Sequence, residues 1–315
     1  MGSASGRLPI SPELPEGVEP VASKQGIPMQ TVFSIAVDAF AYGMVLFVIS
    51  IGLSVTMGLM RVVNLAHGAF AMIGGYIASY VARDLGLGYA TAVIAAVVIT
   101  IIVAIPIERF LFRRIYGAPE LTQVLMTIGI TFCVIGIANY MMGPTLKTIP
   151  LAGALQGSAD LGFRTIPVHR LFVILCGLAV ALALWFAIDR TSFGVKLRAS
   201  VDDAAMAAAL GVRTEIIYAV SFAVAVGLAA FGGVVGAELL PVEPYYALRY
   251  MVTFLVVVSV GGAGSIPGAL IACLLLGAID TTGRYLMPEF GEFFFYLAVI
   301  AIICVFPRGL AGRAK

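Results

Sequence analysis

Charged residues are scarce for a chain of this length. Asp, Glu, Lys and Arg make up 11% of the 315 residues, whereas 61% are hydrophobic, and the mean hydropathy is +1.05. A soluble domain has about a quarter charged residues, because its surface faces water. The composition therefore excludes a soluble globular enzyme and a disordered chain, and it indicates that lipid surrounds most of the polypeptide.

Histidine and cysteine are also rare. The sequence has two histidines, His67 and His169, and four cysteines that stand singly within apolar stretches, without C-x-x-C spacing. This pattern predicts no metal site, no redox site and no cofactor, and we expect the cysteines to be small buried hydrophobic residues. A net charge of +2, without a basic run interleaved with aromatics, predicts no nucleic-acid partner.

The first 30 residues differ from the rest of the chain. They hold five prolines, three glutamates and no apolar run, so we expect residues 1–30 to form a flexible polar tail. A basic segment followed by a short apolar segment is absent there, which argues against a cleaved secretory signal. Residues 31–315 are then predicted to form one transmembrane domain.

Apolar runs of the length that crosses a bilayer, about 20 residues, recur through that domain. They lie at 33–59, 66–82, 89–107, 121–142, 170–188, 216–240 and 291–307.

A further apolar segment, residues 250–280, is interrupted by Gly261, Gly262, Gly264 and Gly268. The interruption predicts a bend between two arms of about 10 to 14 residues each, with the loosened backbone sheltered inside the protein. The sequence thus predicts an all-α integral membrane protein with eight or nine transmembrane helices, some of them broken by glycine.

Basic residues near the ends of these segments set the expected orientation. They gather in the loops 108–120 and 189–215 and at the C-terminus. By the positive-inside rule these regions face the cytoplasm, which requires residues 250–280 to cross the membrane twice. The N-terminal tail and the loop 143–170 then lie outside.

Asn64 and His67 lie between the first two apolar runs, within Arg61–Gly68. Polar groups at a membrane boundary or within the bilayer need a partner or a water-filled cavity, because contact with lipid is costly. Two interpretations stay open. The stretch is either an interfacial turn in which Asn64 caps the next helix and His67 faces headgroups, or a helix break beside a translocation path.

The loop 189–215 has the pattern of a short capped helix. Ser200, followed by Asp202 and Asp203, is typical of a helix N-cap with an acidic first turn, and Gly211 is typical of a helix end. We therefore predict a cytoplasmic helix over residues 201–210.

One face of that helix carries Met206 and Leu210, four residues apart, and Lys196 and Arg198 flank it. A short helix outside the membrane with an apolar pair suits a groove on another protein. The alternative is a helix that lies along the lipid headgroups.

Acidic residues near segment ends are expected to be paired or to reach toward water, rather than to form a proton relay. They are Asp38, Glu108, Glu238, Glu243 and Asp280.

The glycine-rich break lacks the lysine of a phosphate-binding loop, so the chain has no predicted ATPase activity of its own. Close packing of helices is the better explanation of Gly264 and Gly268.

Several short motifs along the chain form a recognisable set. They are Gly52-Leu53 with Gly58, Val63–Gly68, Gly74-Gly75-Tyr76, Thr127 with Gly129, Thr131 and Asn139, Thr191 with Phe193-Gly194, Arg198-Ala199, Asp202-Asp203, Ala207 and Gly211-Val212, the glycine break, and Phe306–Leu310. From about residue 33 to 312, this set resembles the bacterial branched-chain amino acid ABC permeases. One departure is Val195-Lys196-Leu197, where that family often has Arg-Ala, and it bears on the fit to an ATPase.

The resemblance implies a non-enzymatic permease, the smaller of two membrane subunits of an importer in the bacterial inner membrane. Its implied partners are a second permease, two cytoplasmic ABC ATPases and an extracytoplasmic binding protein. The implied substrate is a branched-chain amino acid or a related small polar or organic-acid metabolite. An ion-coupled secondary transporter is the alternative, but it would need mid-membrane acids and an internal repeat.

The resemblance also implies two different roles for residues of the chain. A translocation path is implied for Asn64, His67, Thr127, Thr131 and Asn139. Contact with the ATPase is implied for Lys196, Arg198, Asp202, Asp203, Met206, Leu210 and Gly211.

Overall fold

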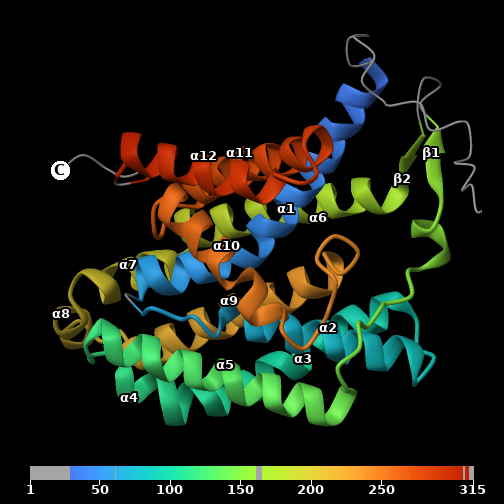
Figure 1. Cartoon of the computed structure of the whole chain (residues 1–315). Coiled ribbons are helices and arrows are strands. Elements are labelled where there is room, and N and C mark those ends of the chain that lie inside the picture. The colour runs from blue at the N-terminus through green and yellow to red at the C-terminus, as the bar shows by residue number, and fades with distance from the viewer. Residues whose placement is uncertain (1–28, 61, 161–164, 308, 312–315) are drawn as a thin grey trace, which may run out of the picture.

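The computed structural model describes residues 29–60, 62–160, 165–307 and 309–311 (Figure 1). Arg61 and nearly all of the predicted polar tail lie outside the described residues.

Apolar helices make up most of the described chain. In chain order they are α1 (Met29–Leu59), α2 (His67–Arg83), α3 (Tyr89–Ile107), α5 (Glu120–Met142), α6 (Val168–Asp189), α9 (Thr214–Val235), α10 (Tyr246–Gly261), α11 (Ile266–Leu286) and α12 (Gly291–Val305).

The connections contain shorter elements. A π-helical turn, Glu108–Phe112, joins α3 to α4 (Arg113–Ile115), and the loop 189–215 holds α7 (Ser192–Asp202) and α8 (Ala204–Ala209). The loop after α5 contains a 3-10 turn (Gly153–Leu155) and a small antiparallel hairpin of β1 (Ser158–Asp160) and β2 (Thr165–Pro167), in which Ala159 pairs with Ile166.

The predicted class of an all-α membrane protein fits this architecture, but the predicted number of crossings is not confirmed. Within the described residues, six helices are long and apolar enough to cross a membrane, namely α1, α3 with its extension, α5, α6, α9 and α11. α10 and α12 are apolar but shorter. The sequence estimate of eight or nine counted every apolar run, whether or not a full-length helix forms there.

Helix α1 is the centre of the molecule. It packs against α6, α9, α10 and α11, and Figure 1 shows it passing between them. Large side chains along it, including Phe47, Ile49 and Ile51, are fully buried. A helix that is apolar on all sides is stable only when protein or lipid covers every face, and here protein covers most of α1.

Glycines allow α1 to approach its neighbours closely. A Cβ atom added to Gly277 of α11 would lie 2.8 Å from the Cα atom of Gly43 in α1. At the other end of α1, a Cβ atom on Gly58 would overlap the backbone of Gly264. Backbones can come this near only where a side chain is missing, as in tightly packed membrane helices.

The bend predicted in residues 250–280 is present, between α10 and α11. Gly262 and Gly264 have φ values of 88° and 82°, a backbone region that favours glycine. The Ser265 Oγ atom accepts a hydrogen bond from the backbone N–H of Gly268 at 3.1 Å and so caps α11. The predicted arm lengths were wrong, because α10 has 16 residues and α11 has 21. Helix α11 continues to Leu286, past Asp280, where the apolar segment was predicted to end.

The two ends of the helix bundle differ. The α10–α11 turn lies beside the C-terminal segment, since the backbone N–H of Leu310 donates to Val260 O at 2.7 Å. Figure 1 shows α4, α7 and α8 at this end and the β-hairpin at the opposite end. The loops 108–120 and 189–215 and the described residues 309–311 therefore lie at one end of the bundle.

The cysteines follow the prediction only in part. Cys273 is buried, but Cys133 and Cys304 are exposed, because they lie on outward faces of apolar helices. In a membrane protein such faces meet lipid, so an apolar run does not guarantee burial in protein.

We expect Gly58→Ala to destabilise the protein by about 1–3 kcal/mol or more, because the new methyl group overlaps backbone that cannot rotate away. The temperature of unfolding in detergent measures the effect. Gly136→Ala is the matched control, since nothing lies within 4 Å of a Cβ atom there, and alanine favours helix. Equal unfolding temperatures for the two variants would contradict the packing argument.

The orientation can be tested with single cysteines at Ala263, in the α10–α11 turn, and at Glu289, between α11 and α12, in a background without the native cysteines. Both positions are exposed. We expect Glu289→Cys to react with a membrane-impermeant thiol reagent from outside, and Ala263→Cys to react only from the cytoplasmic side. Reaction of Ala263→Cys from outside would reverse the assigned orientation.

Candidate functional site

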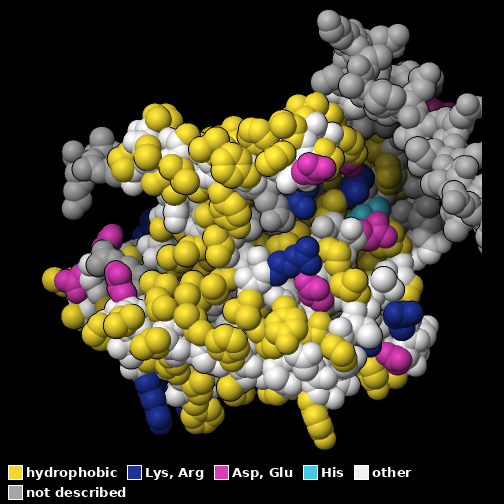
Figure 2. Space-filling view, in the orientation of Figure 1, with side chains coloured by type: hydrophobic (Ala, Val, Ile, Leu, Met, Phe, Trp, Pro, Cys, Tyr) yellow, Lys and Arg dark blue, Asp and Glu magenta, His cyan; other side chains and the backbone are white. Residues whose placement is uncertain are grey.

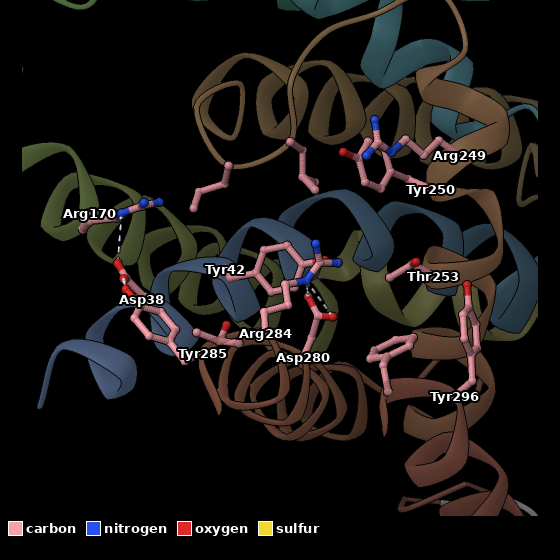
Figure 3. A pocket seen from close by; sticks show the side chains of 14 residues that line it. Asp38, Tyr42, Arg170, Arg249, Tyr250, Thr253, Asp280, Arg284, Tyr285 and Tyr296 are labelled. Atoms are coloured by element: carbon pink, nitrogen blue, oxygen red, sulfur yellow. Dashed lines mark hydrogen bonds and ion pairs between the residues drawn. The ribbon is translucent and has the colours of Figure 1, made fainter. Parts of the chain in front are cut away.

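A cavity of about 500 Å³ lies between α1, α6, α10, α11 and α12 (Figure 3). Its charged lining residues are Asp38, Arg170, Arg249, Asp280 and Arg284. Figure 2 shows charged side chains gathered in a hollow of a surface that is otherwise mostly hydrophobic. Such a group of charges on the side of an apolar helix bundle is the strongest departure from what lipid alone would permit.

One group of charges joins three helices. The Arg170 Nε atom of α6 lies 3.1 Å from Asp38 Oδ1 of α1. The Tyr285 hydroxyl of α11 donates a hydrogen bond to Asp38 Oδ2 at 2.9 Å. Asp38 therefore uses both carboxylate oxygens to hold α6 and α11 against α1.

A second pair lies along α11. The Arg284 Nε atom approaches Asp280 Oδ1 and Oδ2 at 3.1 Å and 3.0 Å. Asp280 is largely buried at the cavity wall, and the more exposed Arg284 compensates its charge.

The third pair lies where α10 begins. Arg249 Nη1 is 2.8 Å from Glu243 Oε1, and the Arg249 guanidinium carbon lies 5.6 Å from the centre of the Tyr250 ring. The ring and the carboxylate together fix the direction of this arginine.

The prediction of paired acids is confirmed for the remaining two positions as well. The buried Glu108 accepts a hydrogen bond from the Tyr116 hydroxyl at 2.6 Å, and Glu238 lies 3.4 Å from His169 Nδ1. Burial is the main cause that raises the pKa of Tyr116 well above its usual range, and the hydrogen bond to Glu108 adds to this effect. The phenol therefore stays protonated and remains a donor.

This cavity was not predicted from the sequence. The acids were considered one by one, and Arg170, Arg249 and Arg284 were not considered as a group. The i, i+4 spacing of Asp280 and Arg284 was the one local signal available. The other partners come from segments far apart in the chain, which a single sequence does not bring together.

The predicted path residues Asn64 and His67 lie elsewhere, in the protein interior. Both are buried, so His67 does not face headgroups. The Asn64 Oδ1 atom accepts a hydrogen bond from the Ala66 N–H at 3.1 Å, and His67 Nε2 lies 2.8 Å from the carbonyl oxygen of Ile49. Within the described residues, Asn64 Nδ2 and His67 Nδ1 have no hydrogen-bond partner.

The connection between α1 and α2 is therefore a non-helical segment folded into the core. Gln123 of α5 supports it, because its Oε1 atom accepts a hydrogen bond from the Val63 N–H at 2.9 Å. The prediction that Asn64 caps the next helix is wrong, because the N-cap of α2 is Ala66 and no side chain caps it. The predicted break in the helix is present, and Asn64 stabilises the turn within it.

The three predicted path residues of α5 are satisfied within their own helix. The hydroxyls of Thr127 and Thr131 donate to the carbonyls of Gln123 and Thr127, both at 2.9 Å. Asn139 Nδ2 donates to Ile135 O at 3.2 Å. None of the five predicted path residues is among the lining residues of the charged cavity.

The predicted first residue of the helix over residues 201–210 is wrong. Helix α7 runs through Ser200, whose Oγ atom donates to Lys196 O at 2.8 Å, and whose carbonyl accepts from the Tyr218 hydroxyl at 2.7 Å. Asp203 is the N-cap instead, because its Oδ1 atom accepts a hydrogen bond from the Met206 N–H at 2.9 Å. The packing of α7 against α9 outweighs the local capping preference of serine.

The predicted end and apolar face of this helix are present. Gly211 follows α8 with a φ of 86°, as a helix-ending glycine does. The side chains of Met206 and Leu210 are 59% and 78% exposed. Met206 of α8, and Leu210 directly after its last residue, thus present apolar surface outward in the described part of the chain.

The charged residues beside this helix differ in their roles. Lys196, Asp202 and Asp203 are exposed. Arg198 Nη1 donates to Ile188 O at 2.7 Å and lies 3.5 Å from Asp189 Oδ1. Arg198 thus holds α7 against the end of α6.

In the described part of the chain, no group of three or more His, Cys, Asp or Glu side chains is placed to hold a metal ion.

Comparison with known proteins agrees with this architecture. The family described as "Branched-chain amino acid transport system / permease component" matches residues 35–303. The permease protein LivH of Salmonella typhimurium (strain LT2) is 26% identical over 280 residues, which cover 85% of this chain and 91% of that protein. LivH of Escherichia coli (strain K12) is 27% identical over 283 residues, with 85% and 91% covered. BraD of Pseudomonas aeruginosa is 25% identical over 292 residues, with 89% and 95% covered. No solved structure gives a significant match.

We expect Asn64→Leu to lower transport more than it lowers the amount of assembled protein. Leucine removes both the turn-forming acceptor and the unpaired amide N–H groups. Asn64→Ser is the companion variant, because a serine oxygen can still accept from the Ala66 N–H. Protein yield from membranes and transport in vesicles are the two measurements. A parallel loss of yield and transport in Asn64→Leu, with full recovery of both in Asn64→Ser, would leave Asn64 with a structural role only.

Proposed function

The chain belongs to the permease-component family of branched-chain amino acid transport systems, and from this premise we propose that it forms half of the translocation path of an ABC importer. It is a multi-pass inner-membrane protein. We assign residues 31–315 to a single permease domain and place the loop 189–215 at its cytoplasmic end.

The charged cavity carries this proposal. Lipid does not solvate ions, so a lateral hollow that contains arginines and aspartates needs a polar or protein cover. A second permease subunit placed against this face would enclose the cavity and leave the remaining apolar surface to lipid. The cavity would then lie between two permeases, which is where a path for a polar solute is needed.

We place the buried polar residues on the same route, deeper in the bundle. Asn64 Nδ2 and His67 Nδ1 lack partners within the described residues, and buried polar atoms without partners are rare in folded proteins. Thr127, Thr131 and Asn139 add hydroxyl and amide groups on the neighbouring α5. A conformation that opens the interior would give these atoms water or solute as partners.

The cytoplasmic end supplies the contact with the ATPase subunits. We propose that Met206 and Leu210 insert into a groove on an ABC ATPase, with Lys196, Asp202 and Asp203 at the rim and Gly211 closing the helix. Arg198 is assigned to hold the coupling helices on the membrane domain. Two ATPase subunits and an extracytoplasmic binding protein complete the importer.

The names of LivH and BraD state transport of branched-chain amino acids. For this chain we propose the same substrate class, or a related small polar or organic-acid metabolite.

The ATPase contact gives the decisive experiment. We expect Met206→Asp combined with Leu210→Asp to uncouple ATP hydrolysis from transport in proteoliposomes that contain the assembled transporter. Burial of such a side chain contributes about 1.5–3 kcal/mol, so two charged replacements weaken the contact severely. Substrate-stimulated ATP hydrolysis and uptake of labelled leucine are measured together.

Leu87→Asp is the control variant, because Leu87 is 50% exposed and lies between α2 and α3, away from the loop 189–215. It should leave hydrolysis unchanged. Full stimulation of hydrolysis in the double variant would refute the coupling role. Uptake that runs on an ion gradient without ATP would instead identify a secondary transporter.

A further inference from the structure

We propose that the charged cavity binds its solute by the carboxylate, through Arg170, and therefore selects small aliphatic carboxylates over neutral amides and urea-like solutes. The inference rests on the proposed function, because it names the chemistry of a solute held on the path.

Three arginines from three different helices surround the cavity. Arg170 comes from α6, Arg249 from α10 and Arg284 from α11. In Figure 3 the side chains of Arg170 and Arg284 reach toward the space between the helices, whereas Asp38 and Asp280 lie behind them, nearer the helix backbones. The charge presented to a ligand is thus positive, although each arginine has an acidic neighbour.

One guanidinium nitrogen of Arg170 is available to bind a ligand. Its Nε atom lies beside Asp38 Oδ1 at 3.1 Å. Its Nη1 atom is shielded from solvent and makes no hydrogen bond to any described residue. A buried guanidinium N–H without an acceptor is costly, and the planar fork of arginine matches the two oxygens of a carboxylate. A ligand carboxylate in the cavity would supply the missing acceptor.

The acids of the cavity are already engaged. Asp38 binds Arg170 and Tyr285, and Asp280 accepts two contacts from Arg284. An ammonium group of the solute would have to compete with these partners. The carboxylate is therefore the group of the solute that the cavity recognises, and an α-amino group is not required.

The cavity is of limited size, and the rest of its lining mixes apolar and hydroxyl-bearing side chains. Leu239, Leu240 and Phe295 supply apolar surface, and the hydroxyl groups come from Tyr42, Tyr250, Thr253, Thr281, Tyr285 and Tyr296. A volume of about 500 Å³ is within the usual range for small-molecule sites, in which a few polar groups orient an otherwise apolar ligand. A short branched aliphatic chain can pack against Leu239, Leu240 and Phe295, whereas urea has no apolar part to cover them.

A pair of isosteric probes tests the proposal on the assembled transporter without its binding protein. Isovalerate carries a carboxylate, and isovaleramide has the same shape without charge. We expect isovalerate to raise the unfolding temperature of the complex in a saturable manner, and isovaleramide to bind about tenfold more weakly or worse. Equal binding of the two probes would overturn the proposal.

Variants separate binding from structure. Arg170→Gln should weaken isovalerate binding about tenfold or more, since a neutral amide replaces the guanidinium. Asp38→Asn breaks the same ion pair but leaves the guanidinium in place, so isovalerate binding should persist or become tighter. Arg190→Gln is the control, because Arg190 lies over Trp185 at the opposite end of α6. Equal loss of isovalerate binding in Arg170→Gln and Asp38→Asn would mean that the ion pair only holds the helices together.

The outcome remains interpretable if Arg170→Gln does not assemble, because the two probes on the unmodified transporter decide the question alone. ATP-driven uptake of labelled leucine by the unmodified transporter, together with equal binding of the two probes, would leave the proposed function in place and remove the carboxylate site. Absence of ATP-driven uptake, together with selective isovalerate binding, would remove the proposed function and leave the site.

Discussion

The close approach of α1 to α11 is the contact on which the rest of the structure depends. A Cβ atom on Gly277 would lie 2.8 Å from the Cα atom of Gly43, so the two backbones almost touch. Asp38 lies five residues before Gly43, and Asp280 lies three residues after Gly277. The helix contact therefore places the two acids of the cavity on adjacent helices. It also brings the Tyr285 hydroxyl within 2.9 Å of Asp38. The cavity wall is thus a direct consequence of two missing side chains.

The low polarity of the membrane determines how these charges are arranged. An isolated ion away from water is strongly destabilising, whereas a well-matched ion pair with additional hydrogen bonds is tolerated. Each acid in the cavity has an arginine beside it, and Asp38 also has a tyrosine. The pairs tie α1 to α6 and reinforce α11, so the charges help to define the bundle as well as the cavity. Most of the paired charges gather at this cavity, and outward surfaces elsewhere are largely apolar.

Features that depend on neighbouring residues were predictable from sequence, and features that depend on distant ones were not. The glycines within Gly261–Gly268 predicted the bend, because glycine is favoured where φ is positive. The exposed pair of Met206 and Leu210 followed from helical spacing and an end at Gly211. The start of that helix was misplaced, because Tyr218 binds the Ser200 carbonyl and extends α7 past the apparent cap. The cavity was missed because Asp38, Arg170 and Tyr285 come from three segments that only the folded bundle brings together.

Helix α1 also links the two ends of the molecule. Asp38 lies at the cavity, whereas the Ser54 Oγ atom, about four turns later, accepts a hydrogen bond from the Gly264 N–H at 3.1 Å. Val55 shares an apolar groove with Leu197 of α7. The same rigid helix thus contacts the α10–α11 turn and α7 at one end and carries a cavity carboxylate at the other. Since the glycine contact joins α1 closely to α11, a shared displacement of these two helices relative to α6 would change the contact between Asp38 and Arg170. The cavity and the surface around α7 are therefore connected through a single helix.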